Sequence, residues 1–136
     1  MAQKYATKNA DTIKGLMLMG SVLTRDNHKI NDDGTTHFNF NVPTLTMGGS
    51  KDGLMRITRV AESWYHQIEN IEATQANMFP VYGLDGASHW SFASGTPPGA
   101  VAKKDLKPEI SEDDAHKAFA AQMVTFTEMI ISEKVT

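Results

Sequence analysis

The sequence predicts an α/β fold with about three parallel strands and crossover helices, on two observations. Short apolar runs at residues 13–23, 42–47 and 78–84 predict strands, and helical patterns at residues 54–68 and 111–133 predict helices between and after them. Strands and helices that alternate along a chain are typical of a parallel sheet, because each connection between parallel strands has to cross back over the sheet.

The first part of the chain combines one strand with a polar excursion. Residues 2–12 are polar and mildly helical. Residues 13–23 (IKGLMLMGSVL) are apolar at nearly every position, which predicts a strand buried on both faces of the sheet. Asn, Asp, Gly and His are frequent in residues 26–41, so we expect a loop there, with a turn at residues 31–34 and an extended piece at residues 36–40.

The second strand leads through a glycine-rich loop into a helix. Residues 42–47 (VPTLTM) predict the strand, and residues 48–53 (GGSKDG) predict a tight loop of small residues. Apolar side chains then recur with a period of 3.6 residues, which predicts an amphipathic helix over residues 54–68. The apolar stripe of this helix consists of Leu54, Ile57, Val60, Ala61, Trp64 and Ile68.

A third strand and a last helix complete the pattern. Residues 78–84 (MFPVYGL) predict the strand, and residues 85–89 form the loop at its carboxyl end. Prolines indicate another loop over residues 93–108. Ser111 is a typical N-cap and precedes three acidic residues that suit the helix dipole, so we expect a helix over residues 111–133. Its buried face consists of Ala115, Phe119, Met123, Phe126 and Ile130.

Composition and charge exclude several classes of protein. The 136 residues have the size of one domain, and a net charge of -3 is not the basic surface that binds nucleic acid. The chain has no cysteine, which excludes disulfides, thiolate metal sites and a cysteine nucleophile. No segment has the apolar length of a membrane span, and the polar start is not a secretory signal. We therefore expect a soluble protein without cofactor or metal, and the cytoplasm is favoured.

Two polar side chains follow neighbouring strands of the predicted sheet. Asp52 lies in the loop after residues 42–47, and His89 ends the loop after residues 78–84. Because the sites of parallel sheets lie at the carboxyl ends of the strands, we expect Asp52 and His89 at the edge where such sites occur. Such a pair moves the proton of a nucleophile in acyl transfer. In the simpler alternative, Asp52 only caps the turn before Leu54 and His89 only bonds a backbone carbonyl.

Both loops, with their strands, resemble the corresponding parts of α/β-hydrolases of the serine-hydrolase superfamily. Residues 42–53 (VPTLTMGGSKDG) are similar to the strand and acid loop of these enzymes, and residues 83–89 (GLDGASH) to their last strand and histidine loop. Residues 52–59 (DGLMRITR) are similar to members near the chlorophyllases and dienelactone hydrolases. The resemblance covers residues 13–126 and implies that the chain corresponds to the C-terminal portion of that fold.

The resemblance implies that Asp52 and His89 are the acid and the histidine of a triad that hydrolyses carboxylic esters or related acyl compounds. It therefore also implies that the Asp52 carboxylate bonds the His89 imidazole at about 2.6–3.2 Å. The family also needs a serine in a Gly-x-Ser-x-Gly elbow, which this sequence does not contain. Ser88, Ser91 and Ser94 are too close to His89 along the chain to replace it. We therefore expect a fragment or subunit that supplies two triad members to a nucleophile on another segment. The alternative is an inactive, hydrolase-derived binding or structural protein.

The resemblance also predicts a partner. In the complete fold, the strand at residues 13–23 pairs on one side with the strand that precedes the nucleophile. Without that strand, the stretch from Gly15 to Val22 is an open apolar edge, which natural proteins cover because it recruits other chains. We expect a complementary hydrolase segment or a second copy of the chain on this edge. If the chain is active, its substrate is a small ester-like molecule.

Further polar and aromatic side chains receive simpler interpretations. His28 and His37 lie near several aspartates, but no spacing there matches a known metal site, so we expect a solvated loop. Arg56 and Arg59 follow the acid loop, where a solvated face is favoured over a role in holding a carboxylate. Trp90, next to His89, is a candidate for lining a pocket.

Overall fold

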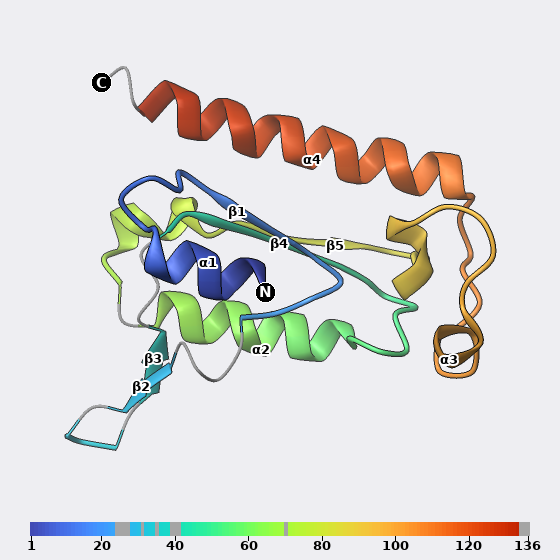
Figure 1. Ribbon diagram of the computed structural model, residues 1–136, viewed down its shortest axis with the longest axis horizontal. Coiled ribbons are helices and arrows are strands. Elements are labelled where there is room, and N and C mark those ends of the chain that lie inside the picture. Colours follow the sequence, from blue (N-terminus) through green and yellow to red (C-terminus); the bar gives the residue numbers. More distant parts are fainter. Residues whose placement is uncertain (24–27, 31, 35, 39–41, 70, 134–136) are drawn as a thin grey trace.

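A three-stranded parallel sheet forms the middle layer of the protein (Figure 1). The computed structural model describes residues 1–23, 28–30, 32–34, 36–38, 42–69 and 71–133. Within the sheet, the strand order is β1 (Leu16–Met19), β4 (Thr44–Gly49) and β5 (Val81–Leu84), and both pairings are parallel. The predicted α/β class with three parallel strands is therefore confirmed.

Helices cover both faces of this sheet. On one face lies α4 (Glu112–Glu133), and on the other lie α1 (Ala2–Lys8) and α2 (Ile57–Ile68) (Figure 1). Shorter helical segments are η2 (Ala73–Met78), η3 (His89–Phe92) and α3 (Gly99–Ala102). Within the described residues, no helix combines the length and the apolar character that crossing a bilayer requires.

The central strand is β4, and every one of its residues is buried. Leu45 and Met47 belong to the core beneath α4, together with Phe119 and Phe126. On the opposite face, Gly48 leaves room for the side chains of α2, since a Cβ there would lie 3.0 Å from Val60 Cγ2. Close packing of α2 on the sheet thus depends on a residue without a side chain.

At the sheet edge, β1 is shorter and more exposed than the sequence predicts. The strand has four residues instead of the apolar run 13–23, and only Leu18 is buried, whereas 49% of Met19 is exposed. Gly20, with a φ of +56°, ends the strand. The expected burial on both faces is wrong because β1 pairs only with β4 and has no strand on its other side among the described residues.

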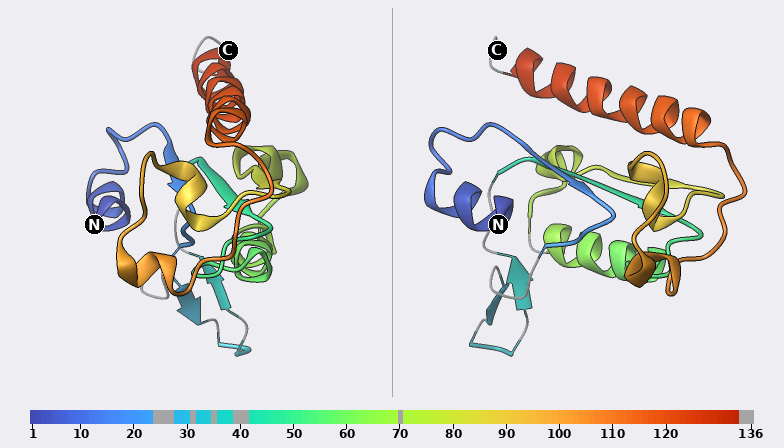
Figure 2. Two further views of the ribbon diagram at one scale, coloured as in Figure 1. Left: turned by 90° about the vertical axis from the view of Figure 1, so that its right-hand side faces the viewer. Right: turned by 45° about the vertical axis from the view of Figure 1, so that its right-hand side comes forward.

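The connection between β1 and β4 contains a hairpin. Strands β2 (His28–Ile30) and β3 (Thr36–Phe38) pair antiparallel, and both views in Figure 2 show them projecting away from the sheet. The extended piece predicted at residues 36–40 is confirmed up to Phe38, and the rest of it lies outside the described residues. Residues 32–33 form the predicted turn, whereas residue 31 lies outside the description.

The buried face of α2 differs from the predicted stripe. Leu54 lies before the helix and is exposed, and Ala61 is exposed within it. The side chains that α2 buries are those of Val60, Ser63 and Gln67. The correction follows from the packing against Gly48 and Gly83, which sets the rotation of the helix by accepting Ile57 and Val60.

The last helix positions the loop that follows β5. α4 begins one residue after Ser111, whose hydroxyl accepts the backbone NH of Asp114 at 3.0 Å, as its N-cap role predicts. Phe119 of α4 stacks on Phe92 of η3, with 4.1 Å between ring centroids. Because η3 begins with His89, this contact connects the core to the candidate site.

Candidate active site

The loops after β4 and β5 meet at the carboxyl edge of the sheet. The backbone NH of Ser50 donates to the Leu84 carbonyl at 3.1 Å, and that of Lys51 donates to the Ala87 carbonyl at 2.9 Å. Gly49 permits this approach, because a Cβ there would collide with the Ala87 carbonyl oxygen. Neighbouring parallel strands therefore bring the predicted acid loop and histidine loop together.

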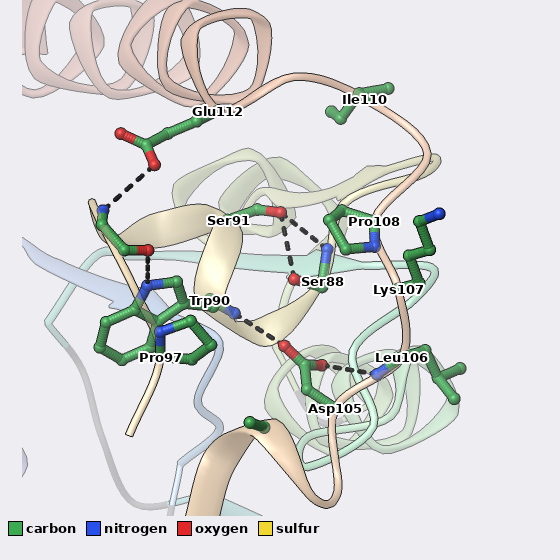
Figure 3. Close-up of a pocket in the computed structure, with 12 residues that line it drawn as sticks. Ser88, Trp90, Ser91, Pro97, Asp105, Leu106, Lys107, Pro108, Ile110 and Glu112 are labelled. Carbon is green, nitrogen blue, oxygen red and sulfur yellow. Dashed lines mark hydrogen bonds between the residues drawn. The ribbon is translucent and has the colours of Figure 1, made fainter. Parts of the chain in front are cut away.

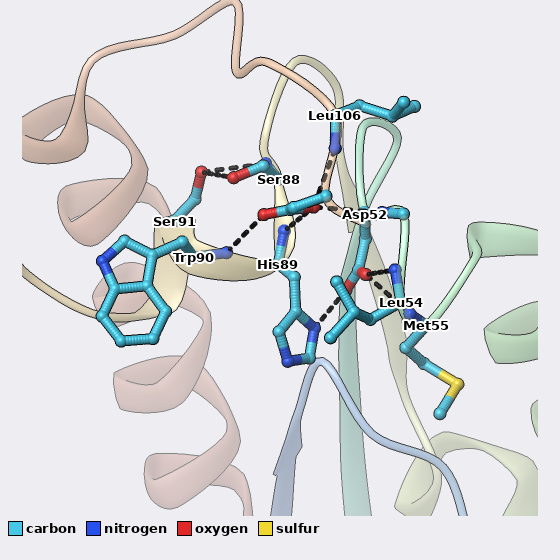
Figure 4. Close-up of polar contacts among 10 residues, drawn as sticks. Asp52, Leu54, Met55, Ser88, His89, Trp90, Ser91 and Leu106 are labelled. Carbon is cyan, nitrogen blue, oxygen red and sulfur yellow. Dashed lines mark hydrogen bonds and ion pairs between the residues drawn. The ribbon is translucent and has the colours of Figure 1, made fainter. Parts of the chain in front are cut away.

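Asp52 is buried, with 2% of its surface exposed, and both oxygens of its carboxylate form hydrogen bonds. Oδ1 accepts the backbone NH groups of Leu54 at 2.9 Å and Met55 at 2.6 Å, and Oδ2 lies 2.8 Å from His89 Nδ1 (Figure 4). The turn-capping alternative and the acid–histidine pair are therefore both present, on different oxygens. The expected contact between Asp52 and His89 is found.

The contact with Asp52 determines which nitrogen of His89 carries the proton. An ionised carboxylate only accepts hydrogen bonds, so Nδ1 is the donor and Nε2 of the neutral ring is left as a base. Nε2 makes no hydrogen bond with any residue that the structure describes. With 28% of its side chain exposed, the ring is open to a reactant while the acid behind it is not.

Gly20 is a functional candidate that the sequence analysis did not identify. It lies directly after β1, and a Cβ there would lie 3.1 Å from His89 Nδ1 and 3.2 Å from Phe92 Cε2. Figure 4 shows the His89 ring at the tip of this turn. Its positive φ and the nearby ring both favour glycine. A glycine after a strand gives no sequence signal for this role.

Asp105 is the second residue that sequence reasoning missed. Its Oδ1 accepts the backbone NH groups of Gly53 and His89, both at 3.0 Å, and Oδ2 accepts that of Trp90 at 3.0 Å. The Leu106 NH adds a local bond to Oδ1 at 3.1 Å. A single aspartate after two lysines belongs to no motif, so no signal in the sequence identifies it.

The surroundings of Asp105 favour its ionised form. Partial burial raises the pKa of Asp105. Hydrogen bonds from the backbone NH groups of Gly53, His89 and Trp90 and from the Ser88 hydroxyl together lower the pKa by more than burial raises it. The pKa of Asp105 consequently lies below its usual range. At neutral pH, the candidate site contains a charged carboxylate that faces backbone NH groups.

The nearby serines do not contact the reactive nitrogen of His89. Ser91 Oγ accepts the Ser88 backbone NH at 2.8 Å and lies 3.3 Å from Ser88 Oγ, which forms a capping box for η3. Both residues are buried, whereas Ser94 is exposed. The hydroxyls of Ser88 and Ser91 therefore have structural positions, and none of the three serines has a hydrogen bond to the imidazole among the described contacts.

Trp90 lines a cavity of about 430 Å³ between η3 and the segment that leads to α4 (Figure 3). Pro97, Leu106 and Pro108 contribute apolar walls. The indole NH donates to the Gly95 carbonyl at 2.9 Å, which holds the ring in place. The predicted pocket position of Trp90 is thus confirmed.

Other polar residues named from the sequence lie elsewhere. Arg56 and Arg59 are exposed near the start of α2, as expected. His28 and His37 lie in β2 and β3, and Asp26 lies outside the described residues. In the part of the chain that the structure describes, no three His, Cys, Asp or Glu side chains gather where a metal ion would be held.

Comparison of the chain with protein-family models, with curated proteins and with solved structures found no match in any of the three. What the site can do is therefore inferred from its own geometry. It combines a buried carboxylate, an oriented imidazole with an available nitrogen, and a second carboxylate that binds the backbone of both loops.

Proposed function

We propose that the chain is the C-terminal part of an α/β-hydrolase-type acyl hydrolase, in which Asp52 and His89 act on a nucleophile from a segment outside this sequence. The observation that supports this most is the 2.8 Å contact between buried Asp52 Oδ2 and His89 Nδ1, with Nε2 available. The substrate class is a carboxylic ester or a related acyl compound, as the resemblance of both loops implies.

The chemistry of the pair suits a hydroxyl nucleophile. Nε2 accepts the proton as the hydroxyl attacks a carbonyl carbon, and the resulting imidazolium donates that proton to the leaving group. Asp52 keeps the ring in the required tautomer and stabilises the positive charge. Burial of Asp52 strengthens this interaction, because little water screens it.

One edge of β1 pairs with no strand among the described residues, which supports this edge as the place where the proposed additional segment would join. Met17 lines a groove of about 240 Å³ with Met123 and Val124 of α4, and 57% of Val124 is exposed. An unpaired strand edge beside an apolar groove is a surface on which a further strand can pair. β1 is followed by Gly20, which lies against the His89 ring, so a strand added on this edge would end near that ring.

The alternative proposal is a hydrolase-derived binding or structural protein without activity. It is supported by the serine positions, since no hydroxyl among the described residues bonds His89 Nε2. Removal of the nucleophile from a triad eliminates most of the acceleration that the triad provides. If no further segment joins the chain, the oriented imidazole has no group to activate.

An assay of the chain alone and in its native assembly distinguishes these proposals. The purified 136-residue chain is expected to hydrolyse p-nitrophenyl butyrate no faster than free imidazole. Material purified under native conditions from the source organism through a tag on this chain is expected to hydrolyse it. A fluorophosphonate probe is expected to label a serine on the accompanying segment.

Substitutions of Asp52 and His89, which together are called the dyad below, provide the control for hydrolysis and labelling. Asp52→Asn and His89→Asn are expected to abolish both hydrolysis and labelling, whereas the exposed Arg59→Gln leaves both unchanged. Turnover by the chain alone that Asp52→Asn removes would place the nucleophile within residues 1–136. Native material with neither hydrolysis nor a labelled serine would favour the inactive alternative, and an assembly of identical copies would do the same.

A further inference from the structure

The backbone around the dyad converges on one carboxylate. Asp105 accepts the NH of Gly53, the residue after Asp52, and the NH groups of His89 and Trp90, the last of which is visible in Figure 3. These donors come from the acid loop and the histidine loop, which are separated by α2 and β5 in the sequence. We infer that Asp105 is a positioning residue that holds Asp52 and His89 in the geometry needed for catalysis.

Asp105 acts on the dyad through backbone atoms. Asp52 bonds the ring of His89, whereas Asp105 bonds the backbone NH of the same residue, 3.0 Å away. Fixing both the backbone and the ring leaves the imidazole little freedom to rotate away from Asp52. A hydrogen bond from Gly53 to the same Oδ1 atom ties the acid loop to this point.

Ionisation of Asp105 is important for this role. Its two oxygens receive four backbone NH groups, and hydrogen bonds to a charged carboxylate are about twice as strong as neutral ones. An asparagine at this position offers one acceptor oxygen and turns an NH₂ group toward donors. Asp105→Asn therefore removes part of the attachment with almost no change in side-chain volume.

The segment at residues 104–109 packs against the acid loop and the histidine loop, so it holds Asp105 close to both. A Cβ at Gly53 would collide with the Lys104 carbonyl oxygen, so the acid loop packs directly on the backbone that carries Asp105. Beyond it, the Glu109 NH donates to the Gly86 carbonyl at 2.8 Å, and the Glu109 carboxylate pairs with Lys51 at 2.8 Å. Residues 104–109 thus contact both loops at several points.

Proton NMR of the 136-residue chain tests the inference without any substrate. The His89 Nδ1 proton, assigned by its loss in His89→Asn, is expected as a downfield resonance. Asp105→Asn is expected to broaden or remove this resonance while the methyl spectrum of the core is retained. Asp113→Asn, which removes the same charge from the exposed first turn of α4, is expected to leave it unchanged. An unshifted resonance in folded Asp105→Asn would overturn the inference.

Hydrogen exchange of the unsubstituted chain covers the case in which Asp105→Asn does not fold. The amides of Gly53, His89 and Trp90 are expected to exchange at least about tenfold more slowly than amides of exposed loops, the factor that one charge-assisted hydrogen bond provides. Exchange of these three amides at the rate of exposed loops would contradict the inference.

The catalytic consequence rests on the proposed function and has a separate readout. In native material that hydrolyses p-nitrophenyl butyrate, Asp105→Asn is expected to lower kcat by about 10²-fold with KM nearly unchanged, the effect of a misplaced catalytic group. An unchanged kcat would overturn the positioning role. Absence of hydrolysis in the unsubstituted material would count against the proposed function alone, because the resonance and exchange results stand without it.

Discussion

Polar side chains are buried in two regions: the loop end of the sheet, formed by residues 50–53, 85–89 and 105, and the interface between β4 and α2. The two regions differ in whether these side chains form hydrogen bonds. At the loop end, Asp52 and Asp105 accept hydrogen bonds on both of their oxygens. Under α2, the buried polar atoms of Thr46, Ser63 and Gln67 bond no residue that the structure describes. Buried polar groups are costly unless they are paired, so the loop end is expected to resist substitution and the interface to tolerate it.

The largest effect is expected for Gly49→Ala at the loop end. The new Cβ would collide with the backbone of Ala87, which cannot move without separating the acid loop from the histidine loop. We expect a loss of about 3 kcal/mol in the free energy of unfolding, at the upper end of overpacking effects. Urea unfolding followed by circular dichroism measures this change.

Gly99→Ala is the matched control for this substitution. Gly99 opens α3, and a Cβ there meets no atom within 4 Å. Alanine at this position is expected to leave stability unchanged or raise it by up to about 1 kcal/mol, because it restricts the unfolded chain. Equal effects of the two substitutions would show that the close approach of the loops does not contribute to stability.

An intermediate effect, with a pH dependence, is expected for Asp105→Asn. Because the folded-state pKa of Asp105 is lowered, its contribution is complete above the ordinary aspartate pKa of about 3.9 and is lost as pH falls through the lower folded value. At pH 7 we expect a loss of about 2 kcal/mol, from the range for hydrogen bonds to charged groups.

Unfolding experiments at several pH values separate this effect from a general loss of charge. The stability difference between the unsubstituted chain and Asp105→Asn is expected to be constant between pH 5 and 7 and to shrink below about pH 4. Asp113→Asn, in an exposed pair with Lys117, is expected to cost less than about 0.5 kcal/mol at any pH. A difference for Asp105→Asn that stays constant down to pH 2 would show that charge is not its cause.

The sequence predicts the order of the elements better than their burial. The apolar run at residues 13–23 predicts a strand buried on both faces, yet the fully buried strand is β4, whose Thr44 and Thr46 are not exposed at all. Pairing partners decide burial, and a local pattern contains no information on them. The burial of Ser63 and Gln67 in α2 was not predicted either, because it too depends on which element the helix packs against.

The sequence predicted only those residues of the candidate site that lie in a loop directly after a strand. Asp52 and His89 each end a strand–loop unit, so strand topology alone brings them together. Asp105 lies in an irregular segment and acts on backbone NH groups, which every residue except proline has. Gly20 depends on the ring of a residue 69 positions later in the chain. Neither a side chain that binds backbone NH groups nor a glycine that packs against a distant ring produces a recognisable local pattern in the sequence.

The smallest effect, of opposite sign, is expected at the β4–α2 interface. Gln67 is 5% exposed, and neither of its amide atoms has a hydrogen-bond partner among the residues that the structure describes. Gln67→Met keeps an unbranched side chain of similar volume and removes the buried polar group, so we expect a gain of about 1 kcal/mol in the free energy of unfolding. Gln3→Met is the matched control, since Gln3 is also buried but its Nε2 donates to the Val22 carbonyl at 2.8 Å. That substitution leaves the carbonyl without its donor and is expected to cost about 1 kcal/mol. Opposite signs in urea unfolding would establish that pairing, and not burial, decides the value of each glutamine. A loss for Gln67→Met equal to that for Gln3→Met would indicate that a bound water pairs Gln67, and the contrast with the loop end would then disappear.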